Sequence, residues 1–248
     1  MNISFMTFAS SNWVNGPIRF KNDLAYIKKH YNFFDKEFIM NENDLCKDYQ
    51  DKFSPYYSDH GFAYFSWKPY SIRQTLLSLN NNDWLFYIDC GCVFPINRME
   101  NFLNDLKNAI DNTDKDGSLM SLSTYIDKNP NINIPNICIV KQSILKQFGL
   151  ETNIDFLYKF PHWQAGLILI KKTSEAISFF DRWYDFYLNH YEDCVRGGYT
   201  DKKGEHQYFL HNGSDQAIMQ CMLYNEQTKI NNELNFVYKY DLMAHKLG

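Results

Sequence analysis

A short uncharged run, Trp84–Ile88, ends at the carboxylate of Asp89, and this pattern constrains the fold more than any other part of the sequence. Every residue of the run is apolar or aromatic, which is typical of a strand buried on both faces, as parallel strands are. Because ligands of open α/β sheets bind just beyond the carboxyl ends of the strands, Asp89 stands where a metal ion or a phosphate group could bind. Gly91 would let such a ligand approach the backbone closely. The segment alone also fits an aspartate that opens a turn or caps a helix.

Composition and charge narrow the class of protein. The chain has 248 residues, of which 45% are hydrophobic and 22% charged, as in an ordinary globular protein. No repeat or low-complexity linker interrupts it, so we expect a single domain over 1–248. A formal net charge of −4 argues against nucleic-acid binding, which requires a basic face. The six scattered cysteines favour reduced thiols in a cytoplasmic protein over a disulfide framework. No run is long and apolar enough to span a bilayer.

The first third of the chain alternates between strand and helix patterns. We expect strands at Ile3–Phe8, Phe38–Met40 and Trp84–Ile88, with helices over Ile18–Tyr31 and from Pro69 through Leu79. This alternation is the sequence signature of a parallel sheet with crossover helices.

The remaining elements follow with less regular spacing. We expect helices over Met99–Ile110, Ser174–Tyr191 and Asp215–Tyr224. Strands are expected at Asn136–Val140, Trp163–Ile170 and Phe236–Tyr238. A polar loop is expected at Asp111–Gly117, and an irregular segment at Glu192–Asn212. An irregular segment of that length is usually a lid or a binding loop.

Four motifs in order resemble those of bacterial glycosyltransferases of the GT-A type, the enzymes that build lipopolysaccharide and capsule. They are Phe8–Ser11 after the first strand, the block Gly61–Tyr70 with its Trp-Lys-Pro sequence, Tyr87–Cys92, and Ser214-Asp215-Gln216. The resemblance implies an α/β fold made of a single GT-A-like, Rossmann-like domain with a mostly parallel central sheet flanked by helices. Residues 1–95 would form its nucleotide-binding half and residues 96–248 its acceptor-binding half.

The same resemblance implies an activity. The chain would move a sugar from a nucleotide-diphosphate donor, a UDP-sugar by expectation, to a hydroxyl of a bacterial surface glycan or lipid-linked glycan, assisted by Mn²⁺ or Mg²⁺. Such a cation acts as a Lewis acid toward the departing diphosphate. The protein would work in the cytoplasm or at the inner face of the cell membrane, with no nucleic-acid partner.

The resemblance also implies roles for individual residues. The donor would contact Phe8, Ala9, Ser10, Arg19, Trp67, Lys68, Asp89, Cys90 and Gly91. The sugar or the acceptor would contact His162, Trp163, Gln164, Gly166 and Gln216. Asp89 and His245 would bind the metal ion, and Asp215 would be the catalytic base beside Asp89, with Asp193 and Asp201 as weaker candidates.

Each of these residues also has a purely structural interpretation. The turn after Phe8 could be an ordinary helix cap, Lys68 a solvated residue at a helix start, and Asp215 the cap of its helix. Trp163 could be a core residue, and a histidine near the end of a chain often has no special role.

One departure from the family pattern affects the function directly. Most GT-A enzymes carry Asp-x-Asp, whereas this chain has Asp89-Cys90-Gly91 and keeps one carboxylate. A non-catalytic module that binds nucleotide sugars or glycans is therefore an alternative. A metal-dependent phosphohydrolase would also place an aspartate at a strand end, but it would need several clustered carboxylates or histidines that the sequence does not show.

Overall fold

A computed structural model describes residues 2–11, 13–124, 134–240 and 242. Its centre is a six-stranded sheet in the order β2-β1-β3-β5-β4-β6. The strands are β1 (Ile3–Phe8), β2 (Lys36–Met40), β3 (Trp84–Ile88), β4 (Met120–Thr124), β5 (Trp163–Lys171) and β6 (Ile230–Asn231). The predicted α/β fold with a central sheet flanked by helices is confirmed.

The first three strands are parallel, as the strand–helix alternation predicts. β1 pairs in parallel with both β2 and β3, and β4 pairs in parallel with β6. β5 runs antiparallel to both of its neighbours, so the sheet is mixed. All five residues of β3 are buried, because β3 lies between β1 and β5 and helices cover both faces.

Helices cover the sheet on both sides. The longer ones are α1 (Asn15–His30), α4 (Trp67–Ser78), α5 (Met99–Asp116), α7 (Ser174–Val195) and α8 (Asp215–Asn225); the shorter ones are α2 (Lys47–Phe53), α3 (Gly61–Tyr64) and α6 (Gln142–Phe148). Short 3-10 segments lie at Glu42–Asp44, Ser54–Tyr56, Ile96–Arg98, Asn136–Cys138 and Glu233–Tyr240, and a π-helical turn lies at Asp155–Lys159. No helix in the described ranges is long and apolar enough to cross a membrane.

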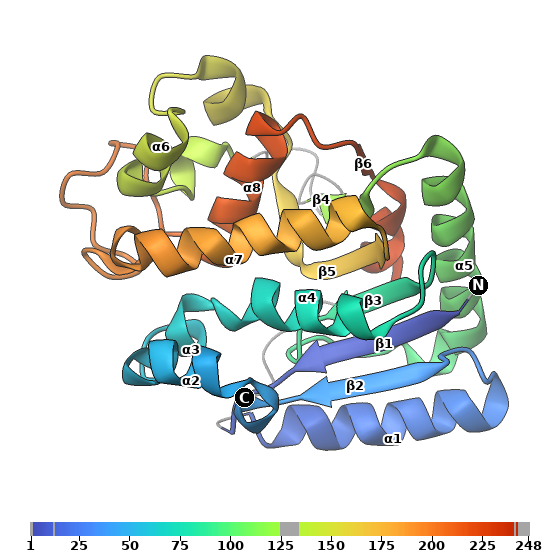
Figure 1. Cartoon of the computed structure of the whole chain (residues 1–248). Helices are drawn as coiled ribbons and strands as arrows, with labels where there is room; N and C mark the ends of the chain where they lie inside the picture. The colour runs from blue at the N-terminus through green and yellow to red at the C-terminus, as the bar shows by residue number, and fades with distance from the viewer. Residues whose placement is uncertain (1, 12, 125–133, 241, 243–248) are drawn as a thin grey trace.

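Side-chain alternation along the strands divides the core in two. Leu85 and Tyr87 of β3 point toward a cluster shared with α4 and α7, whereas Trp84, Phe86 and Ile88 point toward a cluster shared with α1 and α5. Successive side chains of a strand point to opposite faces, so one uninterrupted apolar strand supplies both clusters. Figure 1 shows α4 and α7 lying side by side, and α1 and α5 pack on the opposite face of the sheet.

Three predicted elements are wrong. Asn136–Val140 is not a strand: a 3-10 turn forms at Asn136–Cys138, because the buried Asn136 amide donates to the carbonyl oxygens of Phe156 and Phe160 (2.9 and 3.1 Å). The predicted polar loop at Asp111–Gly117 is instead the last part of α5, which ends where Gly117 takes a φ of +68°.

The predicted last strand, Phe236–Tyr238, belongs to the 3-10 segment Glu233–Tyr240. The segment is held against α5 because Asp105 accepts hydrogen bonds from Lys239 and Tyr240 (2.9 and 2.8 Å). The helix predicted to end at Tyr191 is α7, which continues to Val195. An irregular segment then leads to α8.

Because β3 is central to the sheet and the Phe86 side chain is fully buried, truncating Phe86 should strongly destabilise the fold. We expect Phe86→Ala to lower the free energy of unfolding by about 3–5 kcal/mol, because it removes buried apolar surface and leaves a cavity. Leu77→Ala is the control, since Leu77 is 46% exposed. Urea unfolding measures both variants, and a loss below about 1 kcal/mol for Phe86→Ala would contradict the central placement of β3.

Candidate active site

A cavity of about 780 Å³ opens at the carboxyl ends of β1 and β3. Phe8 and Ser10 line it from the end of β1, and the turn Asp89–Gly91 lines it from the end of β3. Its other walls are Trp13, the segment from Tyr57 to Phe62, Phe65, Trp67 and Tyr199. This is the edge of an α/β sheet at which ligands usually bind.

A buried lysine joins two of the predicted acidic residues beneath this cavity. Lys68, on the first turn of α4, is 1% exposed. Its ammonium nitrogen lies 3.0 Å from Asp89 Oδ1 and 2.5 Å from Asp215 Oδ2, and it donates to the carbonyl oxygen of Ala165 at 3.1 Å. The ammonium group therefore forms two ion pairs and one hydrogen bond. The interpretation of Lys68 as a solvated residue at a helix start is wrong.

The network has one positive charge for two negative charges. Burial alone would lower the pKa of Lys68, but the Asp215 and Asp89 carboxylates together raise it above its ordinary value, so the lysine is charged. Burial raises the pKa of Asp215, and Lys68 opposes that shift. The Asp215 side chain is 8% exposed and that of Asp89 is 37% exposed, so Asp89 alone of the pair presents a carboxylate to the cavity.

Tyr87 adds a second donor to the same carboxylate, since its hydroxyl donates to Asp89 Oδ1. Residues i and i+2 of an extended strand share a face, so the Tyr87-Ile88-Asp89 spacing explains this contact. The rings of Phe65, Tyr87 and Trp67 lie 5.4, 5.4 and 5.8 Å from the Lys68 nitrogen. Such ring faces favour a nearby cation.

Arg19 holds the turn that carries Asp89. Its guanidinium donates to the carbonyl oxygens of Cys90 (2.7 Å) and Cys92 (2.5 Å), and the Cys92 N–H closes the turn on the Asp89 carbonyl oxygen at 2.9 Å. Burial raises the pKa of the Cys90 thiol to about 12, so a thiolate nucleophile at neutral pH is excluded there. Gly91 has open space where a Cβ would be.

Another wall of the cavity is formed by α3 and Phe65, which together make a left-handed turn and not a regular right-handed helix. Gly61, Phe62, Ala63, Tyr64 and Phe65 all have φ between +48° and +66°. This conformation is costly for residues other than glycine. Two hydrogen bonds stabilise it: the Trp67 indole N–H donates to the Gly61 carbonyl oxygen (3.1 Å), and the Tyr187 hydroxyl donates to the Tyr64 carbonyl oxygen (2.7 Å). Strained backbone of this kind concentrates at ligand-binding sites.

The turn gives the cavity its aromatic wall. The Phe62 ring stacks on that of Tyr57 (centroids 4.1 Å apart, planes at 26°), and Phe8 stacks on Trp67 (4.0 Å, 15°). Trp13, 37% exposed, and Tyr199 complete the aromatic lining. Flat rings beside a carboxylate suit a ligand with a ring system and polar groups.

The predicted sugar- and acceptor-binding residues form a buried polar layer instead of lining this cavity. His162 hydrogen-bonds the side chain of Gln216, whose Oε1 accepts from the Ala165 N–H at 3.3 Å. The Trp163 carbonyl oxygen accepts from Gln220 at 2.6 Å. Burial lowers the pKa of His162 to about 3, and the charge interaction with His211 adds to this shift, so the His162 ring is neutral.

The predicted residues thus fall into three groups. The residues that line the cavity are Phe8, Ser10, Trp67, Asp89, Cys90 and Gly91. Those that contact the lining residues or their turn without lining the cavity are Arg19, Lys68 and Asp215. Those absent from the lining are Ala9, His162, Trp163, Gln164, Gly166 and Gln216. Asp215 begins α8, and the residue before it makes no side-chain cap. Sequence reasoning missed Tyr57, Asp59, His60 and Tyr199, which lie in segments without a recognisable pattern, and it assigned no role to Phe62 within the Gly61–Tyr70 block.

The residues described here do not by themselves fit a protein-held metal centre. Among them, no group of three or more histidine, cysteine or acidic side chains could hold an ion. Asp89 is one hard oxygen ligand, and divalent cations in proteins take several. His245, the other predicted metal ligand, lies outside the described residues.

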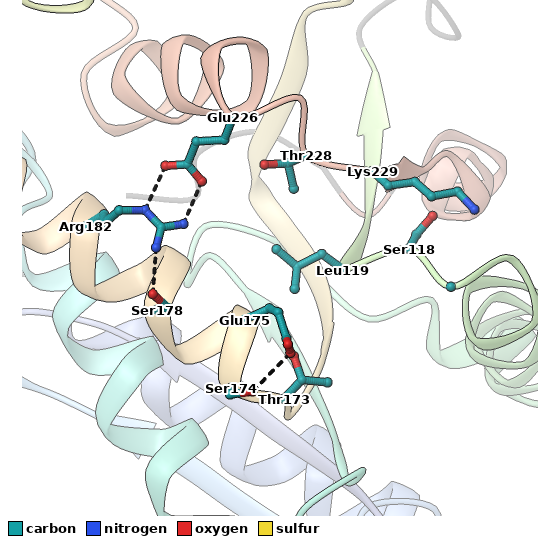
Figure 2. A pocket seen from close by; sticks show the side chains of 11 residues that line it. Ser118, Leu119, Thr173, Ser174, Glu175, Ser178, Arg182, Glu226, Thr228 and Lys229 are labelled. Carbon is teal, nitrogen blue, oxygen red and sulfur yellow. Dashed lines mark hydrogen bonds and ion pairs between the residues drawn. The ribbon is translucent and has the colours of Figure 1, made fainter.

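A second cavity, of about 610 Å³, lies at the other end of the sheet, where α7 begins and α8 ends (Figure 2). Its principal charged groups are already paired: Arg182 forms two hydrogen bonds with Glu226 (2.9 and 2.7 Å) and one with Ser178 (2.6 Å). We therefore take the cavity at Asp89 as the candidate active site.

No protein-family model matches the chain, and no curated protein matches it. Among solved structures, the chain is similar to the galactosyltransferase LgtC in complex with donor and acceptor sugar analogues, at 11% identity and a TM-score of 0.44, over 93% of this chain and 72% of that one. It is also similar to apo mouse xyloside xylosyltransferase 1, at 11% identity and a TM-score of 0.41, over 93% of this chain and 84% of that one. Likenesses at this level do not assign a function.

The buried network predicts a large effect for Lys68→Met. Removing the ammonium leaves Asp215 buried without its counter-charge, so we expect the free energy of unfolding to fall by about 3–5 kcal/mol at pH 7. Because burial raises the folded-state pKa of Asp215, the native variant binds the proton more readily than the unfolded chain does. The deficit should therefore shrink as the pH is lowered from about 7 toward about 5.

Lys239→Met is the matched control, because Lys239 is 60% exposed in its pair with Asp105 and should lose less than about 1 kcal/mol. Urea unfolding across this pH range measures both variants. A Lys68→Met deficit that matches the control, or one that grows as the pH falls, would contradict the charge assignment.

The left-handed turn predicts a specific sensitivity at Gly61. A Cβ there would lie 2.1 Å from the Phe65 ring, whereas at Gly117, with nearly the same φ, it would meet nothing within 4 Å. We expect both alanine variants to lose about 1 kcal/mol from the positive φ, and Gly61→Ala to lose a further 1–3 kcal/mol, roughly, from the clash. Thermal unfolding compares the two, and equal losses would contradict the turn geometry.

Proposed function

We propose that this chain is a glycosyltransferase that moves a sugar from a nucleotide-diphosphate donor, a UDP-sugar in the first instance, to a hydroxyl of a bacterial surface glycan. The observation that carries the proposal is a cavity that combines stacked aromatic rings with the partly exposed carboxylate of Asp89 at the carboxyl ends of β1 and β3. The identity of the acceptor follows from the sequence resemblance alone.

The lining of the cavity suits the two parts of such a donor. The rings of Phe62, Tyr57 and Trp13 offer flat apolar surface for a base or sugar ring. The turn after β3 offers polar groups for the diphosphate: Gly91 leaves room for close approach, and its backbone N–H has no hydrogen-bond partner among the described residues. Arg19 keeps this turn in place through the Cys90 and Cys92 carbonyl groups.

Charge balance bears on the predicted cation. Lys68, Asp89 and Asp215 together carry a formal charge of −1, and the donor diphosphate is itself an anion. Bringing these groups together is unfavourable without a counter-charge. A divalent cation, if bound with the donor, would use Asp89 and His245 as protein ligands and would neutralise the departing phosphate oxygens.

The chain's own residues would bind and orient the substrates. Lys68 fixes the position of the Asp89 carboxylate beside the cavity through their 3.0 Å ion pair. Asp215 in turn fixes the position of the Lys68 ammonium group through their ion pair. Its own carboxylate is buried and does not line the cavity. This geometry favours a positioning role for Asp215 over the predicted role as base.

The second candidate function, a non-catalytic module that binds nucleotide sugars, is favoured by the single carboxylate of Asp89-Cys90-Gly91. The two functions share the cavity and differ in turnover, so one set of measurements separates them.

Isothermal titration with UDP, followed by assays of UDP release from UDP-glucose, UDP-galactose and UDP-N-acetylglucosamine, tests the proposal. We expect the wild type to bind UDP and to turn over at least one of these donors in the presence of Mn²⁺. In Asp89→Asn, which keeps the side-chain shape and loses the charge, turnover should fall by about 100-fold or more.

Asp111→Asn is the matched control, because it removes the same charge from an exposed position of α5 and should leave turnover unchanged. Full turnover by Asp89→Asn would refute the assigned role. UDP binding without any turnover would establish the binding module instead. Loss of turnover in EDTA, restored by Mn²⁺, would support the cation, and unchanged turnover would exclude it.

A further inference from the structure

Among the described residues, two carboxylates line the candidate cavity, and the sequence resemblance accounts for only one of them. Asp89 belongs to the turn after β3. Asp59 lines the same cavity from the segment between Ser54–Tyr56 and the left-handed turn. Asp59 belongs to no motif, and the function proposed above assigns it no role.

The surroundings of Asp59 differ from those of Asp89. The Tyr191 hydroxyl, from α7, donates to Asp59 Oδ2 at 2.9 Å, and among the described residues Oδ1 has no hydrogen-bond partner. Asp59 also forms no ion pair with the described residues, whereas Asp89 is paired with the buried Lys68. The Asp59 carboxylate therefore stands apart from the Lys68 ion-pair network that holds Asp89.

The backbone around Asp59 is firmly held. The Asp59 N–H donates to the Tyr56 carbonyl oxygen (2.9 Å), and the Asp59 carbonyl oxygen accepts from the Phe62 N–H (3.0 Å). Phe62 begins the run of left-handed residues after Gly61 that the Trp67 and Tyr187 side chains hold. The Asp59 carboxylate is thus fixed through Tyr191 on one side and through a strained turn on the other, as a group that must meet a substrate atom should be.

We infer that Asp59 is the general base of the transfer, an inference that rests on the proposed function. In a single displacement, the acceptor oxygen forms a bond to the anomeric carbon while the bond from that carbon to the donor phosphate oxygen breaks. The diphosphate leaves with the bonding electron pair, and the acceptor proton passes to Asp59 Oδ1. The anomeric configuration is therefore inverted, and a positioned base of this kind contributes typically about 10²–10⁴-fold in rate.

Methanol is the acceptor probe, used with whichever of the three UDP-sugars the wild type turns over. We expect a methyl β-glycoside from the α-configured donor, identified by NMR. Asp59→Asn keeps a hydrogen-bond acceptor for Tyr191, so UDP affinity should stay within about twofold while kcat for methyl glycoside formation falls by about 100-fold or more.

Two further variants separate catalysis from structure. Tyr191→Phe removes the anchoring hydroxyl but keeps the carboxylate, so we expect kcat to fall by less than about tenfold. Asp51→Asn, at an exposed position of the nearby α2, should have no effect. A methyl α-glycoside product, an active Asp59→Asn, or loss of UDP binding in that variant would each overturn the inference. Failure of the proposed function itself would show differently, as a wild type that does not bind UDP or does not turn over any donor.

Discussion

The ammonium group of Lys68 connects the parts of the chain from which the candidate site is built. Its partners come from the end of β3, the start of α8 and the Ala165 carbonyl group of β5. A charge so completely removed from water is tolerated only when opposite charges and hydrogen bonds surround it. The position of Asp89 at the cavity, and with it the proposed chemistry, depends on this buried contact between segments that are far apart in sequence.

The aromatic wall depends on a second constraint, which is conformational. The residues from Gly61 to Phe65 adopt a backbone region that is costly for four of the five, and the Trp67 and Tyr187 side chains hold them there. Asp59 precedes this turn in the chain, Phe62 is part of it, and Trp67 and Lys68 follow it. The Gly61–Tyr70 block thus contributes to both the cavity wall and the buried network, which explains why one short block contains so many residues of the site.

The sequence predicted the features that depend on local pattern. Trp84–Ile88 is a central buried strand followed by a cavity-lining aspartate, because uninterrupted apolar residues and a terminal carboxylate leave few other arrangements. The antiparallel direction of β5 was not predictable, since a buried strand reads alike in either direction. The pairing of Lys68 with Asp215 spans most of the chain, and no spacing rule indicates it. Asp59 was missed because it lies in an irregular segment, and the left-handed turn because a single glycine does not reveal five positive φ angles.

A crystal structure of the chain with UDP and Mn²⁺ tests the central claim most directly. We expect UDP in the cavity between the ends of β1 and β3, with its rings against the Tyr57–Phe62 wall and its phosphates at the Asp89–Gly91 turn. UDP bound elsewhere, for example in the cavity beside Arg182, with the Asp89 cavity empty, would show that Asp89 does not belong to the donor site.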